Sequence, residues 1–209
     1  MANNDRKELL INLYNQLWNS INVRTTAIWN SVGLFTGAFA VLALTGNNII
    51  SLDIAASLII MICGWYLANI IDVSFWYNRN LVIISNIEKE FFEKDDLRKI
   101  HSYFGSHRPN NRMIYHFKVQ FFLGVGIGLI FIILHFLKEV LPNIDFDIEK
   151  VRLQGYMPYL IALCVSIYLI RFKARTNRNY SNFVSSSPGI DIDSSDINYD
   201  DQHGFKKKR

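Results

Sequence analysis

The chain has 209 residues, of which 50% are hydrophobic and 19% are charged, and it carries a net charge of +4. A soluble domain carries about 25% charged residues, and here the deficit is concentrated in four apolar stretches, which excludes an ordinary water-soluble globule. Both cysteines, Cys63 and Cys164, lie in those stretches. A disulfide-rich secreted scaffold is therefore excluded as well.

The first 26 residues predict a cytoplasmic amphipathic helix. Leu10, Leu13, Leu17 and Ile21 recur at helical spacing, and polar residues lie between them. The segment has no apolar core of the kind found in a signal peptide. No Pro or Gly separates it from the first apolar stretch, so we expect one long helix that continues into that stretch.

Four stretches predict membrane spans, because about 20 apolar residues at 1.5 Å per residue cross roughly 30 Å of hydrocarbon. They are residues 27–45, 53–71, 117–137 and 155–170. The first two form a transmembrane hairpin over 27–71 and the last two form another over 117–170. The predicted fold class is all-α: a four-pass transmembrane helical bundle with long cytoplasmic helix extensions.

The distribution of Lys and Arg predicts the orientation of these spans. The connection 138–154 contains three of them and the turn between the first two spans contains none, whereas the other nineteen lie at the two ends of the chain and around the central connection. Cytoplasmic loops carry the excess of Lys and Arg. We therefore expect a multi-pass membrane protein with both termini and the central connection in the cytoplasm.

The cytoplasmic parts differ in character. Residues 72–116 begin as a helix and end in a basic, turn-rich loop, whose histidines do not have the spacing of a zinc site. Residues 171–209 are first basic and then rich in Ser and Asp, a composition that buries too little apolar surface to fold alone. We predict a disordered tail there.

Two small-xxx-small pairs predict close helix contacts in the membrane, Gly33 with Gly37 and Gly124 with Gly128. Ile83 and Ile87 lie on an apolar stripe of the cytoplasmic helix. All six residues are candidates for helix packing or for an oligomer contact. Packing within one subunit and contact between subunits both stay open.

Polar groups at membrane depth are candidates for function. They are Asn30, Asn69, Asp72, His135 and Ser166. Asp72 and His135 lie near the membrane boundaries, and no series of ionisable residues crosses the bilayer centre, which weakens an ion-coupled transporter.

Four residues are candidates for polar or ligand contacts, namely Asp72, Arg79, Arg108 and Arg112. The basic loop that contains Arg108 and Arg112 suits a phosphate, a nucleotide or anionic lipid. The chain has no Gly-rich nucleotide loop, hydrolase elbow or zinc-protease motif. We therefore expect no enzymatic activity, no cofactor, no metal and no direct nucleic-acid binding.

The run GWYLANIIDVSFWYNRNLVIISNIEKEFF, Gly64–Phe92, resembles the RipA-type octameric membrane proteins of bacteria and, more loosely, the SLATT-type effectors of bacterial defence. The matching positions are Trp65, Trp76, Tyr77, Arg79, Asn80, Ile87 and Glu88. The resemblance extends over residues 5–92. Those families centre on one hairpin, whereas this chain has a second. The resemblance implies an oligomer of the bacterial inner (cytoplasmic) membrane, with a cytoplasmic helical bundle and a membrane-perturbing role in antiviral defence.

Two classes of function remain. The first is a non-enzymatic, homo-oligomeric integral membrane protein, an effector or scaffold that responds to a cytoplasmic signalling partner or a nucleotide ligand. The alternative is a small transporter, channel or immunity-type membrane protein. Long cytoplasmic helices favour the first class, because a minimal transporter has little use for them.

Overall fold

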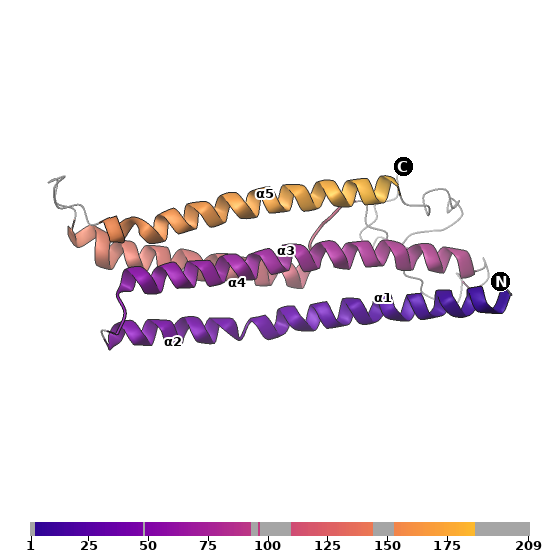
Figure 1. Ribbon diagram of the computed structural model, residues 1–209, viewed down its shortest axis with the longest axis horizontal. Helices are drawn as coiled ribbons and strands as arrows, with labels where there is room; N and C mark the ends of the chain where they lie inside the picture. Colours follow the sequence, from indigo (N-terminus) through magenta and orange to yellow (C-terminus); the bar gives the residue numbers. More distant parts are fainter. Residues whose placement is uncertain (1–2, 48, 93–95, 97–109, 144–152, 187–209) are drawn as a thin grey trace. The chain divides into compact units, whose positions relative to one another are not determined.

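The computed structural model describes residues 3–47, 49–92, 96, 110–143 and 153–186, and within these residues every regular element is helical (Figure 1). The long helices are α1 (Asn3–Ser31), α2 (Leu34–Gly46), α3 (Leu52–Phe91), α4 (Tyr115–His135) and α5 (Met157–Ser185). A π-helical turn, η3 (Phe136–Val140), and a 3₁₀ turn, η4 (Leu141–Asn143), follow α4. A second 3₁₀ turn, η6 (Leu153–Tyr156), leads into α5.

Four helical segments are long and apolar enough to cross a membrane. They are Asn4–Gly46, Leu52–Phe91, Tyr115–Val140 and Met157–Ser185. The all-α prediction with four such helices is thereby confirmed. Every one of the four is longer than the roughly 20 residues that a bilayer requires.

The chain divides into two compact units, and three of the long helices contribute to both. The apolar unit consists of Ala27–Asp72 and Met113–Ala174. The polar unit consists of Met1–Thr26, Val73–Arg112 and Arg175–Arg209, as far as these ranges are described. Each unit has its own packing.

In the apolar unit, α3 is the central helix. Its Tyr66 ring meets Phe35 of α2 edge to face, with the ring centroids 5.0 Å apart. A Cβ atom added at Gly64 would lie 2.5 Å from Cγ1 of Val165 in α5, so only glycine allows that helix so close. The most apolar window of α3 is 56% buried, against 6% to 22% for the other three segments.

The other helices of the apolar unit turn large hydrophobic side chains outward. Phe122 and Ile130 of α4 are 71% and 62% exposed, and Ile170 of α5 is 70% exposed. Exposed apolar surface on this scale suits a lipid environment or contact with further protein, because water disfavours it.

The polar unit has a hydrophobic core between α1 and the second half of α3. Its buried residues are Leu17, Ile21, Leu81, Ile84 and Ile87, and Tyr14, Trp18, Tyr77 and Ile83 pack around them. These residues recur every three or four positions on both helices, as expected for two facing helical stripes. Leu17 and Ile21 of the predicted stripe therefore pack within a single chain, whereas Leu13 is 38% exposed.

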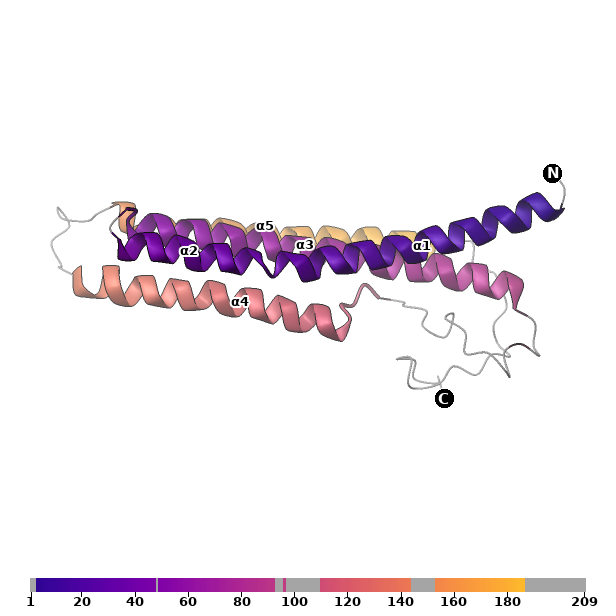
Figure 2. The ribbon, with the colours of Figure 1, turned by 90° about the horizontal axis from the view of Figure 1, so that it is seen from below.

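The first helix differs from the single continuous helix that was predicted. It passes residue 26 without a break but ends at Ser31, and α2 begins at Leu34 (Figure 2). Around the interruption, the backbone N–H groups of Val32 and Gly33 donate to the carbonyls three residues earlier, and the Ser31 hydroxyl donates to the Ile28 carbonyl. Such tightened turns interrupt the regular hydrogen-bond ladder.

The predicted disordered tail from residue 171 is wrong for its first part, because α5 continues to Ser185. Tyr180 is buried, and its ring lies 6.3 Å from that of Phe75 in α3. The composition of this segment gave no sign of its contact with Phe75, which lies far away in the sequence. The acidic part of the tail and most of the basic central loop lie outside the described residues.

Candidate functional site

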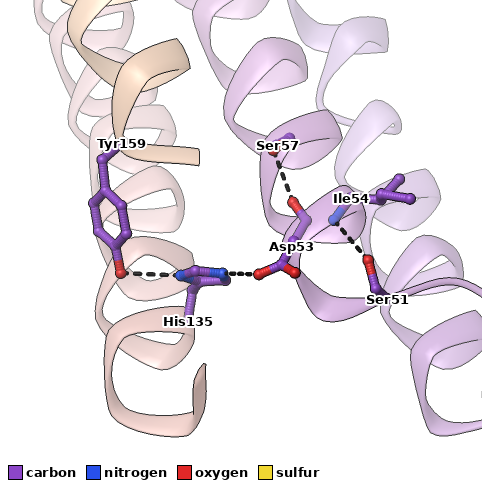
Figure 3. Close-up of polar contacts among 6 residues, drawn as sticks. All are labelled: Ser51, Asp53, Ile54, Ser57, His135 and Tyr159. Atoms are coloured by element: carbon purple, nitrogen blue, oxygen red, sulfur yellow. Dashed lines mark hydrogen bonds and ion pairs between the residues drawn. The ribbon is translucent and has the colours of Figure 1, made fainter. Parts of the chain in front are cut away.

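Three polar side chains from three helices of the apolar unit meet in one chain of hydrogen bonds (Figure 3). His135 of α4 lies between Asp53 of α3 and Tyr159 of α5. Its Nε2 is 2.7 Å from Oδ1 of Asp53, and its Nδ1 is 2.9 Å from the hydroxyl oxygen of Tyr159. The His135 side chain is fully buried and that of Asp53 is 22% exposed. We call these residues the Asp–His–Tyr triad.

Local structure explains how α3 holds Asp53. The residue lies in the first turn of the helix, where an acidic side chain is favoured by the helix dipole. The Ser51 hydroxyl accepts a hydrogen bond from the Ile54 N–H at 3.4 Å, and the Ser57 hydroxyl donates to the Asp53 carbonyl at 2.7 Å (Figure 3). Asp53 thus sits on an ordered helix start.

The two partners are held at helix ends as well. His135 is the last residue of α4, and the π-helical turn η3 begins at the next residue. Such π-turns are rare and frequently occur at functional sites. Tyr159 lies in the first turn of α5, directly after η6. Three helix termini therefore converge on one imidazole.

The hydrogen bonds of the triad fit both the neutral and the protonated form of the imidazole ring. In the neutral ring, Nε2–H donates to Asp53 and Nδ1 accepts from the Tyr159 hydroxyl. In the protonated ring, both nitrogens donate, and the Tyr159 oxygen becomes an acceptor. Only the Tyr159 hydroxyl has to turn, so the contacts survive a change of charge.

The polar unit also contains buried polar side chains. Fully buried Asn78 donates from Nδ2 to Oδ1 of Asn111 at 2.9 Å and to the Arg112 carbonyl at 3.0 Å, and Asn111 donates to Asn177 at 3.2 Å. These bonds attach the segment before α4 to α3 and α5.

Charged groups lie at the far end of the same unit. The Tyr14 hydroxyl donates to Glu88 at 3.2 Å, and exposed Arg6 pairs with Glu90. Burial lowers the pKa of the neighbouring Lys89, because desolvation disfavours its charged form.

The two predicted glycine pairs have different surroundings. A Cβ added at Gly124 would lie 2.9 Å from the Tyr66 ring, and one at Gly128 would lie 3.7 Å from Cβ of Cys63. Both glycines of α4 therefore face α3 within the chain. By contrast, a Cβ at Gly37 would meet nothing within 4 Å, and Gly33 lies at the interruption between α1 and α2.

The remaining predicted site residues are distributed over both units. Ile87 belongs to the core of the polar unit and Ile83 packs against it. Asp72 falls in the apolar unit, Arg79 and exposed Arg112 fall in the polar unit, and Arg108 lies outside the described residues.

Sequence reasoning found His135 but missed Asp53 and Tyr159. The predicted hairpins offered a signal, because Asp53 begins the second span and His135 lies near the end of the third. Both positions are at the same predicted face of the membrane. The spacing of 82 residues, however, contains no motif that would connect them.

Comparison with known proteins returned no match to a family model, to a curated protein or to a solved structure. The resemblance to the RipA-type and SLATT-type proteins rests on the residues of Gly64–Phe92 alone. The chemistry of the site must therefore be argued from this chain.

Proposed function

We propose that the chain is a non-enzymatic, homo-oligomeric protein of the bacterial cytoplasmic membrane, with four spans and both termini in the cytoplasm. It acts as an effector or scaffold that transmits a cytoplasmic signal to its spans. The observation that carries this proposal is the continuity of α3, whose 40 residues run from the apolar unit into the packed core of the polar unit. A bilayer needs only about half of that length.

A continuous helix is a direct mechanical connection between the two units. A partner or ligand that binds the polar unit would act on α3, and α3 is the helix against which the other spans pack. Resemblance to the RipA-type and SLATT-type proteins supports an oligomer, and within that class it favours a membrane-perturbing role in antiviral defence. The outward-facing apolar residues of α4 and α5 and the open face at Gly37 are available to lipid and to further copies.

Cysteine labelling tests the topology. In a Cys63→Ser/Cys164→Ser background, we expect a membrane-impermeant maleimide added to intact cells to modify Asn47→Cys and to spare Asn110→Cys. Both positions are exposed in the structure, so burial does not confound the comparison. Labelling of Asn110→Cys in intact cells would refute the orientation.

Crosslinking in native membranes, followed by light scattering in detergent, tests the assembly. We expect a defined multimer in both, and membrane depolarisation on overexpression. A monomer in both measurements would remove the effector proposal. A multimer without depolarisation would leave the scaffold role and exclude the membrane-perturbing one.

The Asp–His–Tyr triad favours one second candidate, a small proton-conducting channel. In proteoliposomes with an acidic exterior, such a channel would acidify the lumen without a co-substrate, and His135→Gln would abolish the flux. Unchanged lumenal pH with the wild-type chain would eliminate this candidate.

A further inference from the structure

The polar unit holds one arginine between two aromatic rings. The guanidinium carbon of Arg79 lies 5.1 Å from the centroid of the Trp76 ring and 5.2 Å from that of Phe183. A second guanidinium, that of Arg24 in α1, lies 4.8 Å from the same Trp76 centroid. Helices α1 and α3 therefore bring two positive charges to one indole.

The aromatic scaffold behind Arg79 is ordered by its own packing. Phe75 meets Trp76 edge to face at 5.4 Å, and Tyr180 lies 6.3 Å from Phe75 and 6.4 Å from Phe183. Tyr180 is 1% exposed. The rings that hold the guanidinium thus belong to the packed part of the unit, and the position of the charge is set in advance of any ligand.

The charge of Arg79 has no anionic partner among the residues that the structure describes. Its side chain is half-buried, yet no hydrogen bond or ion pair joins it to a carboxylate there. A guanidinium has five N–H donors in a planar fork, and stacking on rings leaves the edge of that fork available. An anion at this edge would pair with the donors that the rings leave open.

The position of Arg79 along α3 indicates which anion. The helix rise places Trp76 about 7 Å, and the Arg79 backbone about 12 Å, beyond Ile71, the last residue of the apolar stretch. Side chains in a helix lean toward its N-terminus, and the Arg79 guanidinium does so, since it lies over the ring three residues earlier. Arg24 is three residues, or about 5 Å, from the apolar stretch that begins at Ala27. Both charges therefore lie at headgroup depth, where Trp is also favoured.

We propose that Arg79, held by Trp76 and Phe183, binds the phosphate of an anionic phospholipid in the cytoplasmic leaflet. The guanidinium fork matches two phosphate oxygens, and the flanking rings lie beside the glycerol and the upper acyl chains. This site rests on the proposed function, because it requires that the apolar unit spans the bilayer with the polar unit on the cytoplasmic side. It is distinct from the basic central loop that the sequence indicated.

Native mass spectrometry of the full chain in detergent with mixed phosphatidylglycerol and phosphatidylcholine tests this site. The variant Arg79→Gln should lower the occupancy of phosphatidylglycerol about tenfold, because a charge-assisted phosphate contact is lost. Arg178→Gln is the matched control, since Arg178 is an exposed arginine on α5 in the same unit and its removal changes the net charge equally. The control should leave the occupancy within a factor of two. Arg79→Lys, which keeps the charge and the fold, should fall between the two.

Three results would overturn the site. Equal losses in Arg79→Gln and Arg178→Gln would show diffuse attraction to the whole basic surface. Displacement of the bound lipid by inorganic phosphate at equal concentration would show a site for a soluble anion. Occupancy in Arg79→Lys equal to wild type would remove the role of the guanidinium fork. Carbonate extraction of the wild-type chain distinguishes failure of the proposed function from failure of this site. A chain that carbonate extracts from the membrane refutes the proposed function. A chain that stays in the membrane but shows no preference for phosphatidylglycerol refutes only this site.

Discussion

Helix α4 and the interrupted helix α1–α2 both contain a glycine pair, yet the two pairs serve different surfaces. In α4, Gly124 and Gly128 face α3 and permit close contact within the chain. In α2, Phe35 and Ala38 provide the buried face, whereas Gly37 faces open space. The same four-residue spacing therefore describes an internal contact in one helix and an outward surface in the other. A small-xxx-small pair predicts close approach but does not identify the partner.

The largest effect is expected for Gly124→Leu. Even a Cβ at this position would lie 2.9 Å from the Tyr66 ring, and that ring is fully buried and cannot move aside. We expect a loss of about 3 kcal/mol in the free energy of unfolding, from overpacking. SDS titration followed by circular dichroism measures it. Gly126→Leu is the matched control in the same helix, because nothing lies within 4 Å of a Cβ there. Equal losses in the two variants would show that α4 does not pack on α3 through Gly124.

The second contact of α4 with α3 is the Asp–His–Tyr triad, and His135→Phe should break it. The phenyl ring fills the volume but leaves Asp53 and Tyr159 without their partner, which costs about 2 kcal/mol. A double-mutant cycle with Asp53→Asn measures the coupling by the same titration. Additive losses would mean that the His135–Asp53 contact contributes nothing to stability.

Replacement of Gly128 by Ala should have a small effect of opposite sign. The added methyl group would lie 3.7 Å from Cβ of Cys63, which is an ordinary van der Waals distance. Alanine in a helix is favoured over glycine by about 0.5–1 kcal/mol, so we expect a stabilisation of that order. A destabilised Gly128→Ala would indicate that the two helices lie closer than the structure has them.

The smallest effect on folding is expected for Gly37→Leu, which should change the unfolding free energy by less than about 0.5 kcal/mol. This variant nevertheless best distinguishes the Gly37 face from the glycine pair of α4. If the Gly37 face contacts another copy, Gly37→Leu should lower the fraction of chains in the multimer. Light scattering and crosslinking measure that change, with Gly126→Leu again as the control. An unchanged multimer would assign the Gly37 face to lipid.

The sequence predicted the helical class and the four apolar segments correctly, because hydropathy depends on consecutive residues and not on tertiary contacts. It also predicted apolar stripes on α1 and α3, and from these Leu17, Ile21 and Ile87 share the core of the polar unit. It could not predict that α5 continues to Ser185. The polar composition after residue 171 suggested disorder, but Tyr180 and Phe183 contact Phe75 and Arg79, which lie about a hundred positions earlier.

The candidate sites also depend on contacts between distant residues, which the sequence does not show. His135 was visible as a polar residue in an apolar stretch, but the sequence indicated only that it lies near a membrane boundary and not which residues it contacts. The role of Gly64 was equally hidden, since no second glycine stands four residues away to suggest a contact with Val165.

The sequence by itself determined which segments are helical and apolar, since hydrophobicity and the helical period are written in consecutive residues. The tertiary structure alone decided which glycines face a neighbour, which arginine stacks between rings, and that Asp53, His135 and Tyr159 meet. The physical reason is that these contacts depend on the rotation of each helix about its axis and on its register against the next. Both are set by contacts between residues far apart in the sequence, such as His135 with Tyr159 and Arg79 with Phe183.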